Sequence, residues 1–538
     1  MVAKPGTAPL YDAVIVGAGF AGLYALHRLR GMGLSVRLFE EAAGVGGTWF
    51  WNRYPGARCD TESLQYSYQF SEALQQEWDW TERYATQPEI EKYLNHVADR
   101  FDLRSDIQLN ARVDRIILDE TSGHWTIETN NGEPVHATFV VMATGCLSSP
   151  TTPRIEGLDD FAGPRYHTAR WPDEEIDFTG LRVGVLGTGS TAMQVVPLVA
   201  EKAKHLFVFQ RTANYAVPAW NGPLDPERVR QFKANYAENR RLAKQLVSGF
   251  LCHYNDKSAL EVSQEERDRE YERRWLDGGI GYLGAFADIT SNDDSNRTAA
   301  DFIHRKIRAI VKDPVIAEQL VPNSVVGCKR LCVHAEYYAT FNKDNVTLVD
   351  VKDTPIDRIT PGGIVVADEE YEVDALVLAT GFDAMTGALN KIEIQGRGGL
   401  KLAEKWNDGP RAYLGVATAG FPNLFIVTGP GSPSVLTNMV PTIEQHVDFI
   451  ADCISYMRTQ EFAMIEPSVE AENAWIDYND EVAHRTLRYD CASWYLGSNI
   501  PGKKRVFMPF VAGLPIYISK CEEVVAGGYE GFNLTAKT

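Results

Sequence analysis

Residues 11–41 read YDAVIVGAGFAGLYALHRLRGMGLSVRLFEE, and this stretch decides the fold class. Residues 12–16 are predicted to form a short buried strand, residues 23–29 a helix, and residues 35–39 a second strand that ends in Glu40. The glycine-rich turn GAGFAG, residues 17–22, joins the first strand to the helix. The stretch therefore predicts a βαβ unit, and with it a parallel sheet in an α/β protein.

The glycines of this turn have separate roles. Gly17 permits the tight turn, Gly19 lets the backbone approach a pyrophosphate, and Gly22 lets the helix lie close to the strand. The helix N-terminus adds unpaired N–H groups and a partial positive charge. Glu40 lies 23 residues after Gly17, where its carboxylate can accept a hydrogen bond from a ribose hydroxyl. These features favour a dinucleotide site over a glycine-rich structural turn.

Composition narrows the possible partners. The 538 residues are enough for two or three domains. A net charge of -19 and a pI near 5.1 argue against nucleic acid or an anionic membrane surface as the partner. The longest apolar run, residues 13–26, contains three glycines and fits neither a membrane span nor a signal peptide. We therefore expect a cytoplasmic protein that binds neither nucleic acid nor membrane.

The cysteines and two apparent motifs exclude other classes. Eight cysteines are scattered along the chain without a CxxC pair, which predicts reduced thiols rather than a disulfide framework or a metal site. A disulfide reductase would need a cysteine pair soon after the first βαβ unit, but Cys59 stands alone there. Residues 497–504, GSNIPGKK, nearly match an ATP-binding loop but end in Lys rather than Ser or Thr.

A second phosphate turn follows the apolar residues 181–186. Residues 187–192 read GTGSTA, where Ala192 takes the place of the third glycine. The flanking sequence also repeats, because VDRI at 113–116 and MATG at 142–145 are echoed by IDRI at 356–359 and ATG at 379–381. The chain therefore carries two Rossmann-like dinucleotide-binding domains.

The second copy is longer than the first. Gly17 to Gly145 spans 128 residues and Gly187 to Gly381 spans 194, a difference of 66. We assign the surplus to a helical insertion over about residues 221–325, with a capping box at Ser263 and Glu266. The expected domains are a first part of the first dinucleotide-binding domain, 1–148, the second dinucleotide-binding domain, 149–385, and a returning part of the first domain, 386–538.

The two turns should prefer different nucleotides. The position 23 residues after Gly187 is Gln210, followed by Arg211, so the second site lacks an acid for a ribose hydroxyl and has a cation for a 2′-phosphate. The second site is therefore predicted to bind NADPH and the first to bind FAD. A chain with both is suited to hydride transfer from nicotinamide to flavin, and a non-catalytic sensor of two nucleotides is the alternative.

Residues 161–172, FAGPRYHTARWP, match the FxGxxxHxxxWP fingerprint of type I Baeyer-Villiger monooxygenases. The resemblance covers essentially the whole chain, and the run GPGSPSVLTNM at 429–439 is more similar to the phenylacetone and steroid monooxygenase branch. It implies that NADPH and O2 are used to convert ketones into esters or lactones through a flavin C4a-peroxide. A flavin monooxygenase that oxidises amines or sulfides and an NADPH oxidase-like regulator remain as alternatives.

The resemblance also implies roles for individual residues. Arg330 supplies the cation beside the peroxide and Asp60 is its partner, whereas His167 has a hinge role and no direct chemistry. Arg211 and Lys329 hold the 2′-phosphate, and Trp494 covers the nicotinamide. The sequence has no HExxH motif or His/Cys cluster, so no metal is expected, and the chain is expected to be a monomer. Residues that contribute to FAD binding are Gly17, Gly19, Phe20, Gly22, Glu40, Gly47, Thr48, Trp49, Arg58, Asp60, Tyr66 and Val113. Those at the NADP site are Gly187, Thr188, Gly189, Ser190, Ala192, Arg211, Thr212, Lys329 and Trp494, and the ketone pocket includes Leu147, Val435, Leu436 and Met439.

Overall fold

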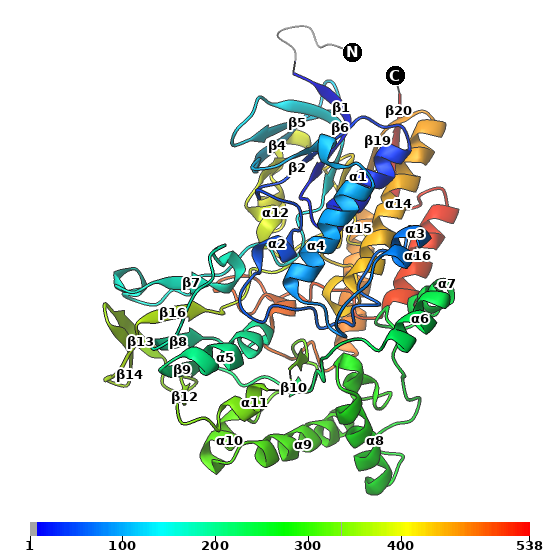
Figure 1. Cartoon of the computed structure of the whole chain (residues 1–538). Helices are drawn as coiled ribbons and strands as arrows, with labels where there is room; N and C mark the ends of the chain where they lie inside the picture. The colour runs from blue at the N-terminus through cyan, green and yellow to red at the C-terminus, as the bar shows by residue number, and fades with distance from the viewer. Residues whose placement is uncertain (1–7, 335, 538) are drawn as a thin grey trace.

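A computed structural model describes residues 8–334 and 336–537 and shows a mixed α/β protein built on two largely parallel sheets. In Figure 1 the first sheet lies in the upper part of the molecule and the second in the lower left, with helices packed on both. The predicted fold class, α/β with two Rossmann-like units, is confirmed. None of the helices in the described ranges combines the length and the hydropathy that a membrane span requires.

The predicted βαβ unit is at the centre of the first sheet. β1 (Leu10–Val16) pairs in parallel with β2 (Val36–Phe39) and β6 (Val135–Met142), and α1 (Phe20–Gly31) connects β1 to β2. The strand order is β17-β4-β5-β6-β1-β2-β3, with β18 also paired to β6. The other strands are β3 (Ile107–Gln108), β4 (Val113–Asp119), β5 (His124–Thr129), β17 (Glu393–Gln395) and β18 (Leu424–Ile426).

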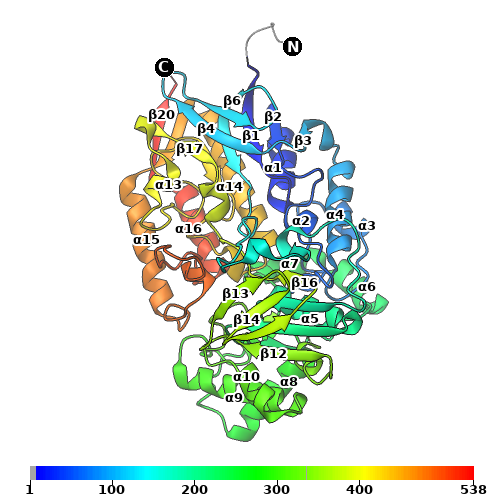
Figure 2. The same cartoon turned by 90° about the vertical axis from the view of Figure 1, so that its left-hand side faces the viewer.

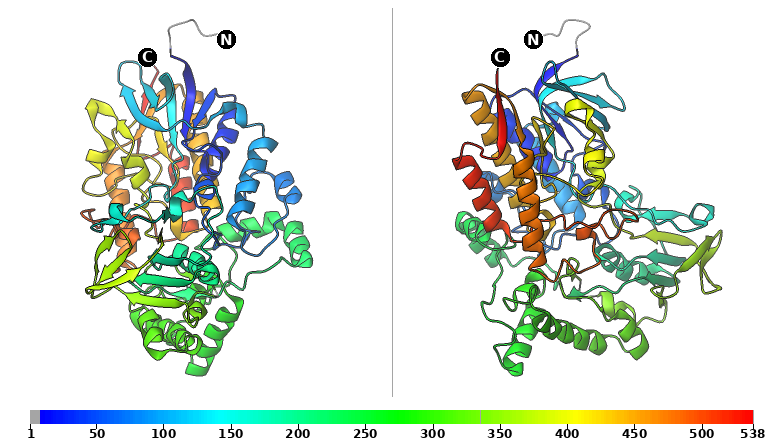
Figure 3. Two further views of the ribbon diagram at one scale, coloured as in Figure 1. Left: turned by 60° about the vertical axis from the view of Figure 1, so that its left-hand side comes forward. Right: turned by 180° about the vertical axis from the view of Figure 1, so that it is seen from behind.

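The C-terminal part of the chain returns to this first sheet. β17 pairs with β4 and β18 pairs with β6, although both strands follow the second sheet in sequence. α14 (Met439–Thr459) packs between α1 and α16 (Leu514–Ala526), and Figure 3 shows these long helices side by side. β19 (Phe462–Pro467) pairs with β20 (Phe532–Ala536) near the end where both termini lie in Figure 2. The remaining helices here are α2 (Thr48–Trp51), α3 (Glu72–Glu77), α4 (Gln87–Arg100), α12 (Gly387–Asn390), α13 (Leu402–Lys405) and α15 (Val469–His484).

The second sheet is parallel throughout, in the order β12-β9-β8-β16-β7. β8 (Arg182–Leu186) leads through the second glycine-rich turn into α5 (Ser190–Lys202) and on to β9 (His205–Gln210), as the sequence predicts. The other strands are β7 (Arg165–His167), β12 (Val346–Asp350) and β16 (Ala375–Leu378). An antiparallel hairpin sheet of β13 (Ile356–Thr360), β14 (Gly363–Val366) and β15 (Glu369–Glu372) precedes β16.

The long helical stretch lies between two short paired strands, β10 (Ala216–Val217) and β11 (Cys332–Val333). α8 (Gln264–Asp277), α9 (Asp293–Ile310) and α10 (Pro314–Leu320) lie at the bottom of Figure 1, next to α11 (Tyr337–Thr340). In contrast, α6 (Pro226–Ala234) and α7 (Tyr236–Lys244) lie beside α3 and α16. The predicted cap is present, because Ser263 Oγ accepts a hydrogen bond from Glu266 N at 3.2 Å.

The chain crosses between the two sheets twice, and the crossings run side by side. Thr151 N donates to the Gly381 carbonyl at 2.9 Å, and Asp383 N donates to the Ser149 carbonyl at the same distance. His167 binds both crossings, since its Nε2 lies 3.2 Å from the Thr151 carbonyl and 3.4 Å from Thr380 Oγ1. Burial lowers the pKa of His167, so the neutral imidazole acts as a hydrogen-bonding link. This placement agrees with a hinge role.

Candidate active site

The first phosphate turn has the close backbone contacts that demand glycine. Gly17 has φ +105°, and a Cβ there would lie 2.6 Å from the Ala143 carbonyl oxygen. A Cβ on Gly22 would lie 1.8 Å from the Gly17 carbonyl oxygen, so α1 begins directly against the turn. The free N–H groups at the start of α1, which includes Phe20, remain available for a pyrophosphate. These features fit the diphosphate of FAD.

Glu40 is buried and holds this turn in place. Its carboxylate accepts hydrogen bonds from Ala18 N at 2.6 Å and from Ala42 N at 2.8 Å. Burial raises the pKa of Glu40, and the two backbone donors partly oppose that shift. Each carboxylate oxygen keeps a further lone pair that can accept a hydrogen bond from a ribose hydroxyl. That contact with the ribose stays a prediction.

The aromatic segment after β2 folds over the same turn. A Cβ on Gly47 would lie 2.9 Å from Gly19 Cα, so the two glycine backbones touch. Thr48 and Trp49 begin α2, and the Trp49 indole donates to the Tyr66 hydroxyl at 3.1 Å. The predicted FAD residues Gly47, Thr48, Trp49 and Tyr66 are therefore together beside Gly19. Arg58 is ion-paired with Glu82 at 3.1 Å, and Val113 is buried at the start of β4.

We expect Gly22→Ala to lower both the FAD content and the melting temperature. The added methyl group would clash with the Gly17 carbonyl, and overpacking of this kind costs about 1–3 kcal/mol. The measurement is the flavin-to-protein absorbance ratio after purification, together with a thermal melt. Gly31→Ala in the same helix is the control, because a Cβ there would meet nothing within 4 Å. Equal FAD content in the two variants would contradict the assignment of this turn.

The second phosphate turn has the same geometry with more open space. Gly187 has φ +116°, and its Cβ would lie 2.4 Å from the Ala379 carbonyl oxygen. A Cβ on Gly189 would meet nothing within 4 Å, so a ligand phosphate can approach this backbone closely. Thr188 Oγ1 donates to the Thr212 carbonyl at 2.6 Å, and Ser190 begins α5. Ala192 is fully buried, as a replacement for the third glycine should be.

Two cations converge beside this turn. Arg211 directly follows β9 and is exposed, whereas Lys329 is half-buried. Burial lowers the pKa of Lys329, and the nearby Arg211 lowers it further. Within the described residues, neither cation forms an ion pair with a carboxylate. Gln210 turns away and donates to the Gln319 carbonyl at 2.7 Å, so these features fit a bound 2′-phosphate.

Arg330 and Asp60 form a bidentate ion pair. Arg330 Nε donates to Asp60 Oδ2 at 2.5 Å, and Nη2 donates to Oδ1 at 2.8 Å. The third bond, from Nη1 to the Val435 carbonyl at 2.6 Å, could not be foreseen from the sequence. Burial opposes the charge on Arg330, but the attraction of Asp60 outweighs it and raises the pKa. The guanidinium therefore remains a cation at every physiological pH.

The four predicted substrate residues belong to one apolar cluster. Leu147, Val435, Leu436 and Met439 pack with Trp494 in the same group, which also contains Cys146, Met385, Tyr495, Leu496, Phe507 and Met508. Because the Val435 carbonyl binds Arg330, this cluster adjoins the ion pair. The structure thus places the predicted apolar and charged residues next to each other.

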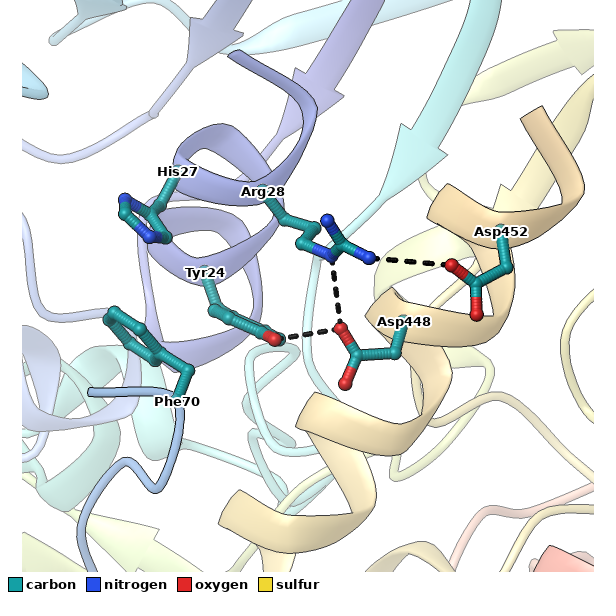
Figure 4. Close-up of a pocket in the computed structure, with 6 residues that line it drawn as sticks. All are labelled: Tyr24, His27, Arg28, Phe70, Asp448 and Asp452. Carbon is teal, nitrogen blue, oxygen red and sulfur yellow. Dashed lines mark hydrogen bonds and ion pairs between the residues drawn. The ribbon is translucent and has the colours of Figure 1, made fainter. Parts of the chain in front are cut away.

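A surface pocket of about 480 Å³ between α1 and α14 is not this site. Figure 4 shows Arg28 reaching across to Asp448 and Asp452, at 3.2 and 3.3 Å. Tyr24 also donates to Asp448, at 2.7 Å, and the remaining lining residues are His27 and Phe70. The charged groups of the pocket therefore pair across a helix–helix contact, and none of the predicted site residues lines it.

The prediction of reduced thiols is wrong for two of the eight cysteines. Cys328 and Cys491 form a disulfide, with Cα atoms 5.6 Å apart and 163 residues between them in sequence. Spacing alone could not reveal the pair, because folding brings together two distant loops. The remaining cysteines are free, namely Cys59, Cys146, Cys252, Cys332, Cys453 and Cys521.

The fold and the site define a class of protein, an oxidoreductase with one phosphate turn suited to FAD, a second suited to NADPH, and a half-buried arginine beside an apolar cluster. A family model described as pyridine nucleotide-disulphide oxidoreductase matches residues 14–248. The chain is 44% identical over 523 residues to a Baeyer-Villiger monooxygenase of Pseudooceanicola batsensis, covering 96% of this chain and 95% of that protein. It is 42% identical over 536 residues to the phenazine N-monooxygenase PhzNO1 of Lysobacter antibioticus, covering 97% of each.

Among solved structures, an oxidised steroid monooxygenase bound to NADP superimposes with a TM-score of 0.94 at 52% identity, covering 98% of this chain and 100% of that chain. The chain therefore belongs to the Baeyer-Villiger monooxygenase family. It is a FAD-dependent monooxygenase that consumes NADPH.

Proposed function

We propose that this chain converts ketones into esters or lactones, with Arg330 as the catalytic cation and Asp60 as the residue that positions it. The observation that carries the proposal is the half-buried Arg330–Asp60 pair beside the apolar cluster around Leu436 and Met439. The similarity to a Baeyer-Villiger monooxygenase and to a steroid monooxygenase supports it. A monomeric chain in the cytoplasm stays a prediction.

The geometry supports a specific division of labour around Arg330. A guanidinium has five N–H donors, and three of them bind Asp60 and the Val435 carbonyl. The two that remain can bind negative charge that develops during oxygen transfer. Because Asp60 and Val435 fix the guanidinium beforehand, little reorganisation is needed when that charge appears.

The apolar cluster has a complementary role. Bound FAD, once reduced by NADPH, supplies the electrons that activate O2. Leu147, Val435, Leu436 and Met439 can hold a ketone and exclude water. In such a low-dielectric environment, the charge of Arg330 acts more strongly on an anion than it would in water. The residues therefore provide both the apolar binding surface and the electrostatic stabilisation.

Nitrogen oxidation is the second candidate, because a relative 42% identical is named a phenazine N-monooxygenase. An amine substrate needs no cation to stabilise an attacking anion, whereas a ketone does. The paired and fixed Arg330 favours the ketone reaction, but both substrate classes need to be tested.

The test is product analysis with the FAD-loaded full chain, NADPH and oxygen. We expect the protein to convert ketones from a panel of linear, cyclic and aromatic members into esters or lactones, detected by gas chromatography with mass spectrometry. Parallel reactions contain an aromatic amine or a thioether. The proposal fails if the N-oxide or the sulfoxide forms and no ketone yields an ester, or if every reaction converts NADPH into hydrogen peroxide alone.

A further inference from the structure

The disulfide between Cys328 and Cys491 joins two segments that the proposed reaction needs. Cys328 directly precedes Lys329 and Arg330, which lie at the phosphate and at the ketone side of the site. Cys491 lies three residues before Trp494, which packs in the apolar cluster. The bond therefore connects the segment that carries Lys329 and Arg330 to the C-terminal loop that carries Trp494.

Further contacts hold the same loop. Arg488 Nε donates to the Gly327 carbonyl at 3.1 Å, so residues 487–491 meet residues 327–328 twice. Leu487 N donates to the Thr290 carbonyl at 2.9 Å, which fixes the loop to the segment just before α9. Arg505 Nη2 donates to the Cys491 carbonyl at 3.0 Å. Each hydrogen bond on its own contributes modestly to stability, whereas the covalent bond removes the freedom of the two segments to separate.

We propose that the Cys328–Cys491 pair is a redox-dependent positioning element for Lys329, Arg330 and Trp494. As a disulfide it holds the C-terminal loop against residues 327–330, and as two thiols it lets the loop separate from them. The inference rests on the proposed function for the roles of these three residues. In a reducing compartment, which the sequence predicts for this chain, disulfides are usually transient and redox-sensing.

The chemistry of the switch is balanced. A dithiol reductant gives two electrons and two protons to the disulfide, and leaves as its own cyclic disulfide while Cys328 and Cys491 become thiols. In the reverse direction hydrogen peroxide accepts two electrons and two protons from the thiols and leaves as two water molecules. Flavin oxidation without a ketone is a source of that peroxide. The Cys328–Cys491 pair would therefore respond to hydrogen peroxide, which is a by-product of the same active site.

The backbone positions of the two cysteines suit a disulfide. The Cα separation of 5.6 Å lies within the range that a disulfide spans without backbone movement. Both side chains are buried, with 3% and 7% of their surface exposed, so the bond lies inside the contact between the two segments. Cys332 is buried four residues after Cys328 but is free, which shows that proximity in sequence does not select the partner.

The test compares oxidised and dithiol-reduced enzyme, with FAD bound and the reductant removed before assay. We expect digestion without reductant to yield a cross-linked peptide pair containing Cys328 and Cys491, which reduction abolishes. We expect reduction to raise the KM for NADPH about tenfold, as it would if the docked loop were populated about one tenth of the time. The KM is measured from NADPH consumption in the presence of oxygen, and re-oxidation with hydrogen peroxide should restore it.

Three variants distinguish a loss of loop positioning from a general loss of structure. Cys328→Ser and Cys491→Ser should each show the raised KM and lose their response to reductant. Cys252→Ser removes a free thiol of the helical stretch and should respond like the wild type. The proposal is overturned if no cross-linked peptide forms in the oxidised enzyme, or if the peptide forms and the KM is the same in both states. A chain that makes no ester but shows the KM response would contradict the proposed function and leave this inference standing.

Discussion

Arg330→Ala is expected to lower the rate of ester formation by about 100- to 1,000-fold, the usual effect of losing one preorganised donor to a developing anion. The alanine variant lacks the cation and leaves Asp60 as an unpaired, half-buried carboxylate next to the apolar cluster. Hydride transfer depends on the position of the nicotinamide as well as on charge, so flavin reduction by NADPH should continue. The electrons should then appear as hydrogen peroxide.

The measurement is anaerobic stopped-flow reduction, followed by mixing with oxygen and ketone and analysis of the ester. Arg330→Lys keeps the charge but loses the planar fork, so it should recover part of the activity. Arg182→Ala is a matched control, because Arg182 contacts Asp374 through Nε at 3.1 Å and Nη2 at 2.7 Å and lies in the second sheet. Ester formation at the wild-type rate by Arg330→Ala would show that this residue is a bystander.

Local patterns predicted the parts of the site that depend on local backbone geometry. Both phosphate turns follow from glycine spacing, because a Cβ at Gly17 or Gly187 would clash with a backbone carbonyl. The strand before each turn follows from a short, largely apolar run. The roles of Lys329 and Arg330 were predicted from a resemblance between motifs. The spacing of an isolated basic pair does not distinguish it from surface charge.

Contacts between distant segments could not be predicted in this way. The Val435 carbonyl on Arg330 is 105 residues away in sequence, and any residue type could supply that oxygen. The position of α7 depends on Arg240, which is buried and donates to the Gln65 carbonyl at 2.9 Å and to Ser67 Oγ at 2.7 Å. In the sequence, a buried arginine in a charged helix cannot be distinguished from an exposed one. The sequence therefore did not indicate that α6 and α7 lie apart from α8, α9 and α10, and it predicted a single helical insertion.

Lys329→Ala is expected to raise the KM for NADPH about 10- to 100-fold with little change for NADH, because a charge-assisted hydrogen bond contributes about 1.5–3 kcal/mol. Arg211→Ala should have a smaller effect, about tenfold, since Arg211 is exposed and its charge is partly screened. The two cations stand close together without a carboxylate partner in the described residues, and burial further disfavours the charge on Lys329. A 2′-phosphate would relieve both effects, whereas NADH has no group at that position.

Steady-state consumption of NADPH and of NADH, each over a range of concentrations, measures the two KM values. Lys204→Ala is the matched control, because it removes the same charge just before β9, at the opposite end of the strand from Arg211. It should leave both KM values unchanged. If Lys329→Ala raised the KM for NADH as much as that for NADPH, the lysine would act on a part common to both nucleotides. The assignment of these two cations to the 2′-phosphate would then be wrong, and the preference for NADPH would have to come from other contacts around the second turn.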